Sequence, residues 1–175
     1  MVIFKDISNF SKLSDYVSIM NGTVIVDLIV IFLSFNGFFK TPYLKSWYQR
    51  FNLSAVIADV LILVIGIIIA RFLYKYIFDT FSIVKFTSLA VVIQIIHDIL
   101  FYVLFKNTPV GYSYILDYFK KYAKDIGASA IVGDSLMMIV ACLISSFMAN
   151  FSLNANVITS IVSVYLIPYF IYQSV

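Results

Sequence analysis

Six ionisable residues lie inside long apolar stretches of the sequence: Asp27, Asp59, Arg71, His97, Asp98 and Asp134. An ionisable group in hydrocarbon costs at least a few kcal/mol, so such groups normally face the interior of a helical bundle and find partners there. Chains of aspartate and histidine inside membranes commonly handle protons or cations. Proton or cation handling is therefore the chemistry that these residue types support best.

Other chemistries fit these residues less well. A catalytic zinc usually has three protein ligands with a spacing such as His-Glu-x-x-His, and His97 is the only histidine. Ser135 follows Asp134 but lacks the Gly-x-Ser-x-Gly turn that exposes a nucleophilic serine. Cys142 is the single cysteine, which excludes an internal disulfide and a Cys-x-x-Cys site. We therefore expect no catalytic residue, no metal and no cofactor, and favour a non-enzymatic protein.

The elements that position these residues follow from the composition. Hydrophobic residues make up 62% of the 175 residues and charged residues 12%, and the mean hydropathy is +1.00. A soluble domain carries about 25% charged residues, because its surface must stay wet. Lipid must therefore cover most of this protein's surface. The net charge of +3 gives no electrostatic basis for binding nucleic acid.

Five segments are apolar enough to cross a membrane, which takes about 20 mostly apolar residues. They are residues 22–39, 54–78, 81–105, 127–150 and 155–173. The second and third are so close together that they predict an antiparallel hairpin. We predict an all-α fold in one domain, a polytopic transmembrane helical bundle of about five spans.

Two further stretches, residues 2–20 and 109–126, place apolar side chains on one helical face and charged ones on another. This pattern suits amphipathic helices in the membrane interface, and equally helices packed on the end of the bundle. In the second stretch, Lys120, Lys121 and Lys124 could meet anionic lipid head groups. We therefore add one or two interfacial helices to the five spans.

Depth divides the ionisable residues into two layers. We name the side of the N-terminus the A end and the opposite side the B end. At about 1.5 Å per residue, Asp59, His97, Asp98 and Asp134 all lie about 8–12 Å in from the B end. Asp27 and Arg71 are expected near the A end at matching depth, as an ion pair. The alternative for Asp27, Asp59 and Asp134 is structural, since each lies early in its span, where a carboxylate complements the helix dipole.

The distribution of all the basic residues between the two sides favours B as the cytoplasmic side, and thus an outward N-terminus. Seven are expected at B, against five at A. The B residues are Lys40, Lys45, Arg50, Lys106, Lys120, Lys121 and Lys124, and the A residues are Lys5, Lys12, Arg71, Lys75 and Lys85. Trp47 lies with Tyr43 and Tyr48 in the first B-side loop, where aromatic residues typically form an interfacial belt.

A stripe of mostly small residues recurs at every fourth position of the fourth span: Ser129, Gly133, Met137, Ala141, Ser145 and Ala149. Small residues let helix backbones approach closely. We interpret the stripe as close packing within the bundle. The alternative is a contact with a second copy of the chain or with another membrane protein.

Four stretches resemble an uncharacterised multi-pass protein of large nucleocytoplasmic DNA viruses. They are WYQRFNLSAVIAD (47–59), IARFLY (69–74), QIIHDILF (94–101) and ILDYFKKYAKDIG (115–127). Such viruses carry an internal membrane beneath the capsid, so the resemblance implies a multi-pass protein of the virion or of a host endomembrane at the assembly site. It implies no catalytic residue.

Three functions are consistent with the sequence. The first is a structural or assembly component of a viral internal or assembly-site membrane. The second is a proton- or cation-linked carrier or channel that uses Asp59, His97, Asp98 and Asp134. The third is a membrane enzyme that acts on lipid head groups, with the polar layer beside Lys120, Lys121 and Lys124.

Overall fold

The computed structural model describes residues 3–39 and 42–173, so Lys40 and the start of the helix expected over 2–20 lie outside the described residues. The described chain forms seven helices and no strand. They are α1 (Ser14–Phe35), α2 (Tyr43–Phe51), α3 (Leu53–Ile77), α4 (Ile83–Asn107), α5 (Tyr114–Ile126), α6 (Ser129–Met148) and α7 (Leu153–Ile171). Helices α1, α3, α4, α6 and α7 are long and apolar enough to span a membrane. The all-α bundle of five candidate spans is confirmed.

Four of the expected spans agree with their helices to within two residues at each end, whereas α1 differs. It begins eight residues before the expected span 22–39 and ends four residues earlier than expected. The residues from Ser14 to Met20 are therefore part of the first span. The helix expected over 2–20 is wrong for residues 3–13, which are not helical.

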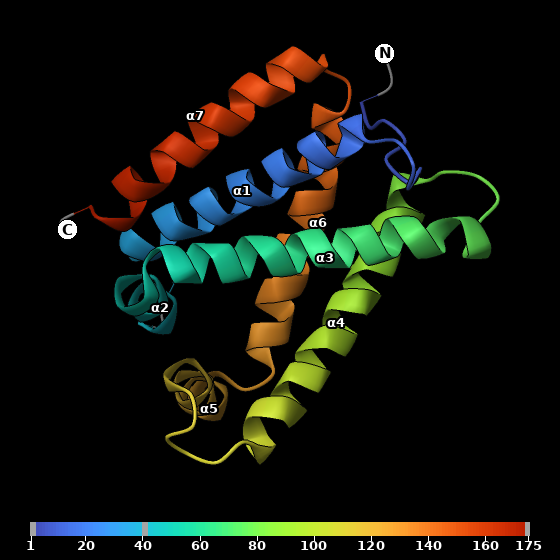
Figure 1. Ribbon diagram of the computed structural model, residues 1–175. Coiled ribbons are helices and arrows are strands. Elements are labelled where there is room, and N and C mark those ends of the chain that lie inside the picture. The colour runs from blue at the N-terminus through green and yellow to red at the C-terminus, as the bar shows by residue number, and fades with distance from the viewer. Residues whose placement is uncertain (1–2, 40–41, 174–175) are drawn as a thin grey trace.

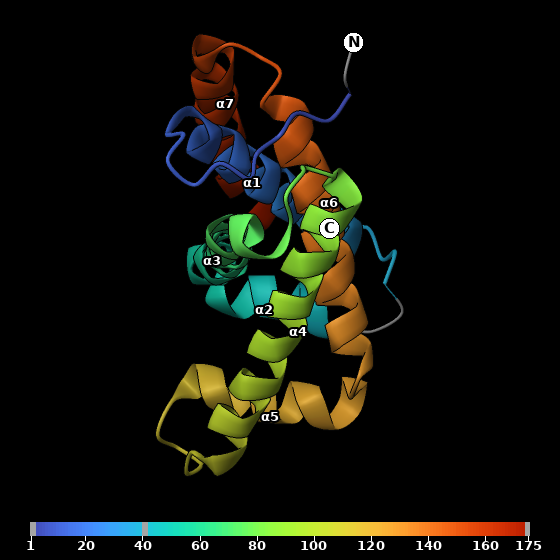
Figure 2. The same cartoon turned by 90° about the vertical axis from the view of Figure 1, so that its right-hand side faces the viewer.

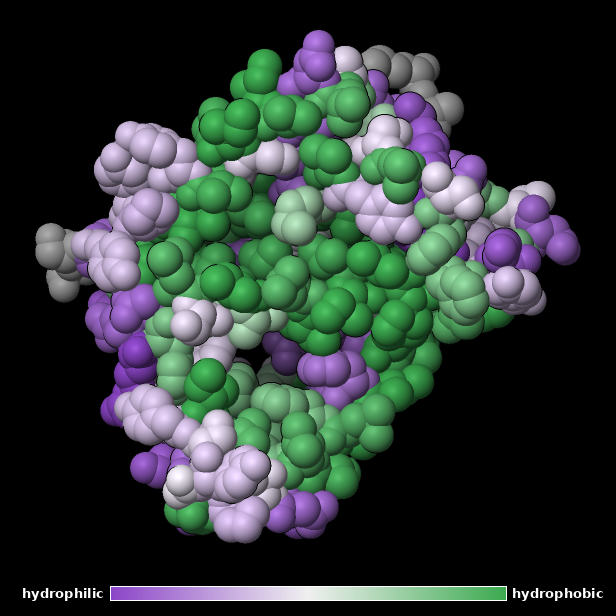
Figure 3. All heavy atoms as spheres, viewed as in Figure 1, coloured by the Kyte–Doolittle hydropathy of each residue, from purple (hydrophilic) through white to green (hydrophobic). Residues whose placement is uncertain are grey.

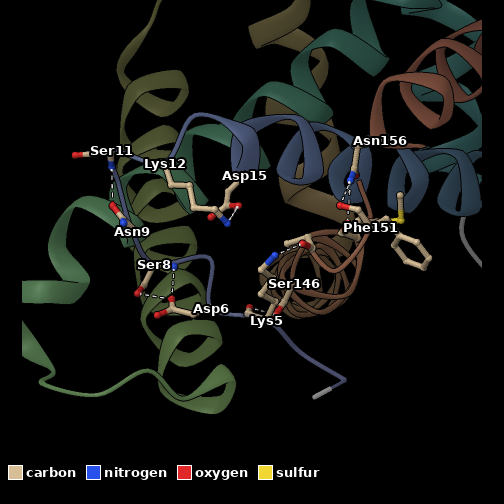
Figure 4. Close-up of polar contacts among 12 residues, drawn as sticks. Lys5, Asp6, Ser8, Asn9, Ser11, Lys12, Asp15, Ser146, Phe151 and Asn156 are labelled. Carbon is tan, nitrogen blue, oxygen red and sulfur yellow. Dashed lines mark hydrogen bonds and ion pairs between the residues drawn. The ribbon is translucent and has the colours of Figure 1, made fainter. Parts of the chain in front are cut away.

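Side chains explain why residues 3–13 form no helix. The Asp6 carboxylate accepts hydrogen bonds from the backbone N and the hydroxyl of Ser8, at 2.8 and 2.7 Å. Asn9 likewise accepts from the backbone N of Ser11 at 3.1 Å (Figure 4). Short polar side chains that bond the backbone two residues onward favour turns over helix. The segment therefore runs as a series of turns across the A end of the bundle.

Helix α2 was not expected, and it packs on α5. Asn52, at φ +47°, separates α2 from α3, because a helix cannot continue through the left-handed region. Helix α5 lies within the predicted stretch 109–126 and is capped at its N-terminus by Ser113, whose hydroxyl accepts from the backbone N of Leu116. The Tyr118 hydroxyl donates to the Tyr43 carbonyl at 2.7 Å. The aromatic face of α5 thus lies against α2, as expected of a helix packed on the end of the bundle.

The five long helices form two groups that cross each other. Helices α7, α1 and α3 lie side by side, and α6 lies beside α4 across them (Figures 1 and 2). Helices α1 and α6 approach most closely at Gly22, where an added Cβ would lie 2.8 Å from the carbonyl oxygen of Ala141. Ser145 meets Gly22 as well. The small-residue stripe of α6 therefore includes a close contact inside the bundle.

The helices are tightly joined at the A end and diverge toward the B end. At the A end, the backbone N of Ser82 donates to the Tyr74 hydroxyl at 2.9 Å, which closes the link between α3 and α4. The two helices then separate, and α2 and α5 lie at their distant ends (Figure 1). Much of the surface between them is hydrophobic, as a lipid-facing surface must be (Figure 3).

Candidate functional site

Arg71 is the largest fully buried side chain, at the A end of α3, and it organises what we call the A-end cluster. Its guanidinium donates to the backbone carbonyls of Asn9 and, at 3.2 Å, Lys12. It lies 3.8 Å from the Asp15 carboxylate and 4.2 Å from the centre of the Tyr16 ring. Lys12 also pairs with Asp15, at 2.6 Å. The buried charges at this end are therefore paired.

The N-terminal segment joins the A-end cluster to α6 through reciprocal hydrogen bonds. The backbone N of Lys5 donates to the Ser146 carbonyl at 3.2 Å, and the Ser146 hydroxyl donates to the Lys5 carbonyl at 2.6 Å. The Lys5 ammonium donates to the carbonyl of Ala149 at 2.9 Å (Figure 4). Residues 3–13 thus connect α3 and α6 across the A end.

The expected ion pair between Asp27 and Arg71 is not formed. Because α1 begins at Ser14, Asp27 lies thirteen residues along the helix, about 20 Å from its A end. Asp27 is 1% exposed and accepts a hydrogen bond from the Tyr48 hydroxyl at 2.7 Å. Asp27 therefore belongs to the B half of the bundle, and Asp15 takes its expected place beside Arg71.

Two aspartates hold α2 against the bundle. The indole N–H of Trp47 donates to the Asp59 carboxylate of α3 at 2.9 Å, and Tyr48 binds Asp27 of α1. The sequence had suggested that Trp47 and Tyr48 belong to an interfacial belt. This prediction is wrong for both, because Trp47 is 6% exposed and Tyr48 is 1% exposed. Burial raises the pKa of Tyr48 well above its usual value, and the nearby carboxylates of Asp59 and Asp27 raise it further.

Among the described residues, Asp98 has hydrogen-bond partners only on its own helix, α4. Gln94 donates to one carboxylate oxygen of Asp98 at 2.7 Å, and His97 Nδ1 lies 3.1 Å from the same atom. The second oxygen of Asp98 is buried without a hydrogen-bond partner. The His97 side chain is 40% exposed and stacks on Phe101. His97 therefore points partly out of the bundle, whereas Asp98 points into it.

Asp134 of α6 makes no hydrogen bond or ion pair with any described residue. Asp134 and Tyr122 of α5 line the same cavity. Burial raises the pKa of Tyr122 above its usual value, and the carboxylates of Asp134, Asp59 and Asp98 raise it further. Three carboxylates from α3, α4 and α6 thus act electrostatically on one phenol. We name Asp27, Asp59, Asp98 and Asp134 the aspartate layer.

The aspartate layer has no basic partner other than His97. Within the described residues, no Lys or Arg nitrogen lies within 4.0 Å of any of its four carboxylates. No three His, Cys, Asp or Glu side chains in this part of the chain are arranged to hold a metal ion. Aspartates inside membranes commonly handle protons or cations. Proton or cation binding is therefore the chemistry that the aspartate layer could offer.

Sequence reasoning missed Tyr48, Trp47, Gln94 and Tyr122 as partners of the layer. The contact of Gln94 with Asp98 could have been predicted, because a residue four positions before Asp98 lies on the same face of the helix. Tyr122 had been assigned to the apolar face of an interfacial helix. Tyr48 and Trp47 lie on α2, whose nine residues are too few for a span. Whether the layer acts in function stays a prediction.

The fold and the polar residues define a class: a polytopic α-helical membrane protein whose spans enclose a layer of carboxylates. No family model, curated protein or solved structure matches the chain.

Proposed function

We propose that the protein is a structural or assembly component of a membrane. The observation that carries this proposal is the use of buried polar groups to join distant segments. The Asn21 amide of α1 donates to the carbonyl of Asn156 at 2.9 Å, and Ser160 donates to Asn21 at 2.5 Å. Arg71 and Asp27 likewise bind residues of other elements. A bundle fixed by hydrogen bonds between helices suits a scaffold, because these bonds resist rearrangement in lipid.

The membrane that we propose is the internal or assembly-site membrane of a large DNA virus. Support for this setting comes from the resemblance of residues 47–59, 69–74, 94–101 and 115–127 to a multi-pass protein of such viruses. Quantitative proteomics of purified particles tests it. The chain should be recovered in amounts similar to the other membrane proteins of the particle. Its absence from particles in which those proteins are abundant would overturn the viral form of the proposal.

A second candidate is a proton- or cation-linked carrier or channel, and the observation that favours it is that, among the described residues, Asp98 has His97 as its one basic partner and Asp134 has none. The test is flux through protein reconstituted in liposomes that contain a pH-sensitive dye. Asp98→Asn and Asp134→Asn should each reduce flux at least about tenfold. Asp79→Asn, in the exposed link between α3 and α4, is the matched control. No flux, or flux unchanged in Asp98→Asn, argues against this candidate.

A further inference from the structure

A cavity of about 390 Å³ opens between α1 and α6 on the B side of their close contact. Val30 and Leu33 of α1 line one wall, and Gly133 and Met137 of α6 line the other. It forms because the two helices touch at Gly22 and separate beyond it. An added Cβ on Gly133 would meet no atom within 4 Å, so the glycine leaves space that a side chain could fill. The volume lies within the range of about 300–1,000 Å³ that is typical of small-molecule sites.

The lining of the cavity is mostly apolar, and Asp134 is the one charged residue among its described lining residues. The Asp134 carboxylate has no hydrogen-bond or ion-pair partner among the described residues. Tyr122 of α5 also lines the cavity, and the hydroxyl of Ser129 is already donated to the carbonyl of Ile126 at 2.6 Å. Among the described residues, no Lys, Arg or His side chain lines the cavity. Its polarity is therefore that of an amphiphile site with one negative charge.

We propose that this cavity binds an amphiphile with an ammonium head group, which pairs with Asp134 while its hydrocarbon chain lies along α1 and α6. The aromatic rings of Phe38, Phe39 and Tyr122 line the cavity and can attract an alkylated ammonium group through their faces. Such a ligand supplies a positive charge that none of the described residues places beside Asp134. The proposal is independent of the structural function and of ion transport.

Competing ligands fit the cavity less well. A metal ion needs several oxygen or nitrogen ligands, and Asp134 is the only carboxylate in the lining. An anionic head group would be repelled by the Asp134 carboxylate, which lines the cavity. An uncharged amphiphile would leave the carboxylate unpaired. Charge complementarity therefore selects a cationic head group.

The molecule also contains an internal control. A second groove of about 470 Å³ lies between α4 and α6, and Thr87, Ser88, Val91 and Leu143 are among its lining residues. No ionisable residue lines it. A ligand drawn only by hydrophobic burial should enter both sites, whereas a ligand recognised by charge should select the cavity beside Asp134.

Photolabelling tests the proposal on the full chain in a neutral maltoside detergent. The probe is a dodecyltrimethylammonium with a diazirine on its chain, and mass spectrometry locates the labelled peptides. We expect labelling of α1 and α6 at the cavity. Asp134→Asn should reduce it at least about tenfold, the effect of losing one charged partner. Gly133→Leu should reduce it by filling the cavity, whereas Ser88→Leu, in the second groove, should leave it unchanged.

The comparison probe is dodecanol with the same diazirine, and circular dichroism verifies that each variant keeps its helices. If dodecanol labels the cavity as strongly as the ammonium probe, or if Asp134→Asn labels like wild type, the proposal fails. Competition by unlabelled phosphatidylethanolamine would support the site and identify a membrane lipid as the source. Competition by unlabelled dodecyltrimethylammonium alone would support it with a free amphiphile as the source.

Discussion

The buried carboxylate of Asp15 at the A end lies beside Lys12 and Arg71, whereas the half-buried carboxylate of Asp134 toward the B end has no basic residue beside it within the described chain. Asp15 lies in the first turn of α1, and Asp134 lies early in α6. In the A half these helices touch at Gly22, and in the B half a cavity separates them. Closed packing thus coincides with paired charges, and open packing with unpaired ones.

The paired charges of the A end should therefore contribute to stability, whereas the unpaired carboxylate of the B half remains available for binding. The N-terminal segment completes the A end by giving backbone carbonyls to Arg71. At the B end, Trp47 and Tyr48 donate hydrogen bonds to Asp59 and Asp27, but they carry no positive charge. Substitutions at the A end should therefore change stability most, and those at Asp134 should change it least.

The largest effect is expected from Arg71→Ala. It leaves the Asp15 carboxylate, which is 2% exposed, without its fully buried partner, and it leaves the Asn9 and Lys12 carbonyls without a donor. Breaking a buried ion pair from one side costs about 3–5 kcal/mol. The free energy of unfolding, measured by titration of mixed micelles with a denaturing detergent, should fall by that amount.

Arg50→Ala is the matched control for Arg71→Ala. Arg50 is an exposed arginine of α2 with a 3.3 Å hydrogen bond to Tyr114, so its loss should cost less than about 1 kcal/mol. Equal destabilisation by the two substitutions would mean that the A-end cluster contributes no more than a surface contact. The contrast between the two ends would then be lost.

Glycine-to-alanine substitutions in α1 and α6 should act with opposite signs. An alanine at Gly22 would press against Ser145 and the Ala141 carbonyl, and such overpacking costs about 1–3 kcal/mol. Gly133→Ala enters open space and should stabilise its helix by up to about 1 kcal/mol. The same unfolding titration measures both. Destabilisation by Gly133→Ala would show that α1 and α6 are also close in the B half.

The sequence predicts the spans well, because hydropathy shows where a span lies and the thickness of the bilayer sets its length. Residues 54–78 and 127–150 became α3 and α6 with shifts of at most two residues. The depth of Asp59, Asp98 and Asp134 also follows from the rise per residue. The carboxylates of these three residues all raise the pKa of Tyr122. The depth of a residue depends only on its position within its own span, so it can be predicted from the sequence.

Partners are harder to predict, because they depend on where helices begin and how they face each other. Starting α1 at residue 22 placed Asp27 near the A end, and the true start at Ser14 moves it to the B half. The sequence of residues 3–13 does not reveal that they bind Arg71. Arg71 donates to backbone carbonyls, and every residue type has one. Trp47 and Tyr48 look like belt aromatics until α3 and α1 bring aspartates to them.

Tyr48→Phe tests how the B half holds its aspartates. It removes the donor to Asp27, which is 1% exposed, and an unsatisfied buried acceptor should cost about 1–2 kcal/mol. Tyr76→Phe is the control, because Tyr76 is 67% exposed and its hydroxyl makes no hydrogen bond with a described residue. Equal unfolding free energies for the two variants would contradict the role of Tyr48.

Alkaline pH should reveal the same interaction. Burial and the carboxylates of Asp59 and Asp27 raise the pKa of Tyr48, so the folded protein holds the phenol proton more tightly than the unfolded chain. The resulting stability is complete below the unfolded value of about 10 and declines as pH rises above it, by up to about 1.4 kcal/mol per pH unit. Wild type should therefore lose stability above pH 10 faster than Tyr48→Phe. Parallel pH profiles would mean that Tyr48 is not buried beside these aspartates.

The smallest effect is expected from Asp134→Asn. Because Asp134 makes no hydrogen bond or ion pair with a described residue, removing its charge breaks no contact, and the desolvation cost of a carboxylate disappears. The free energy of unfolding should stay within about 0.5 kcal/mol of wild type or rise. Asp15→Asn makes the same chemical change where Lys12 and Arg71 lose a partner, and it should destabilise. If Asp134→Asn destabilises as much as Asp15→Asn, the B-half carboxylate has a structural partner, and a ligand bound beside it is no longer needed to explain its charge.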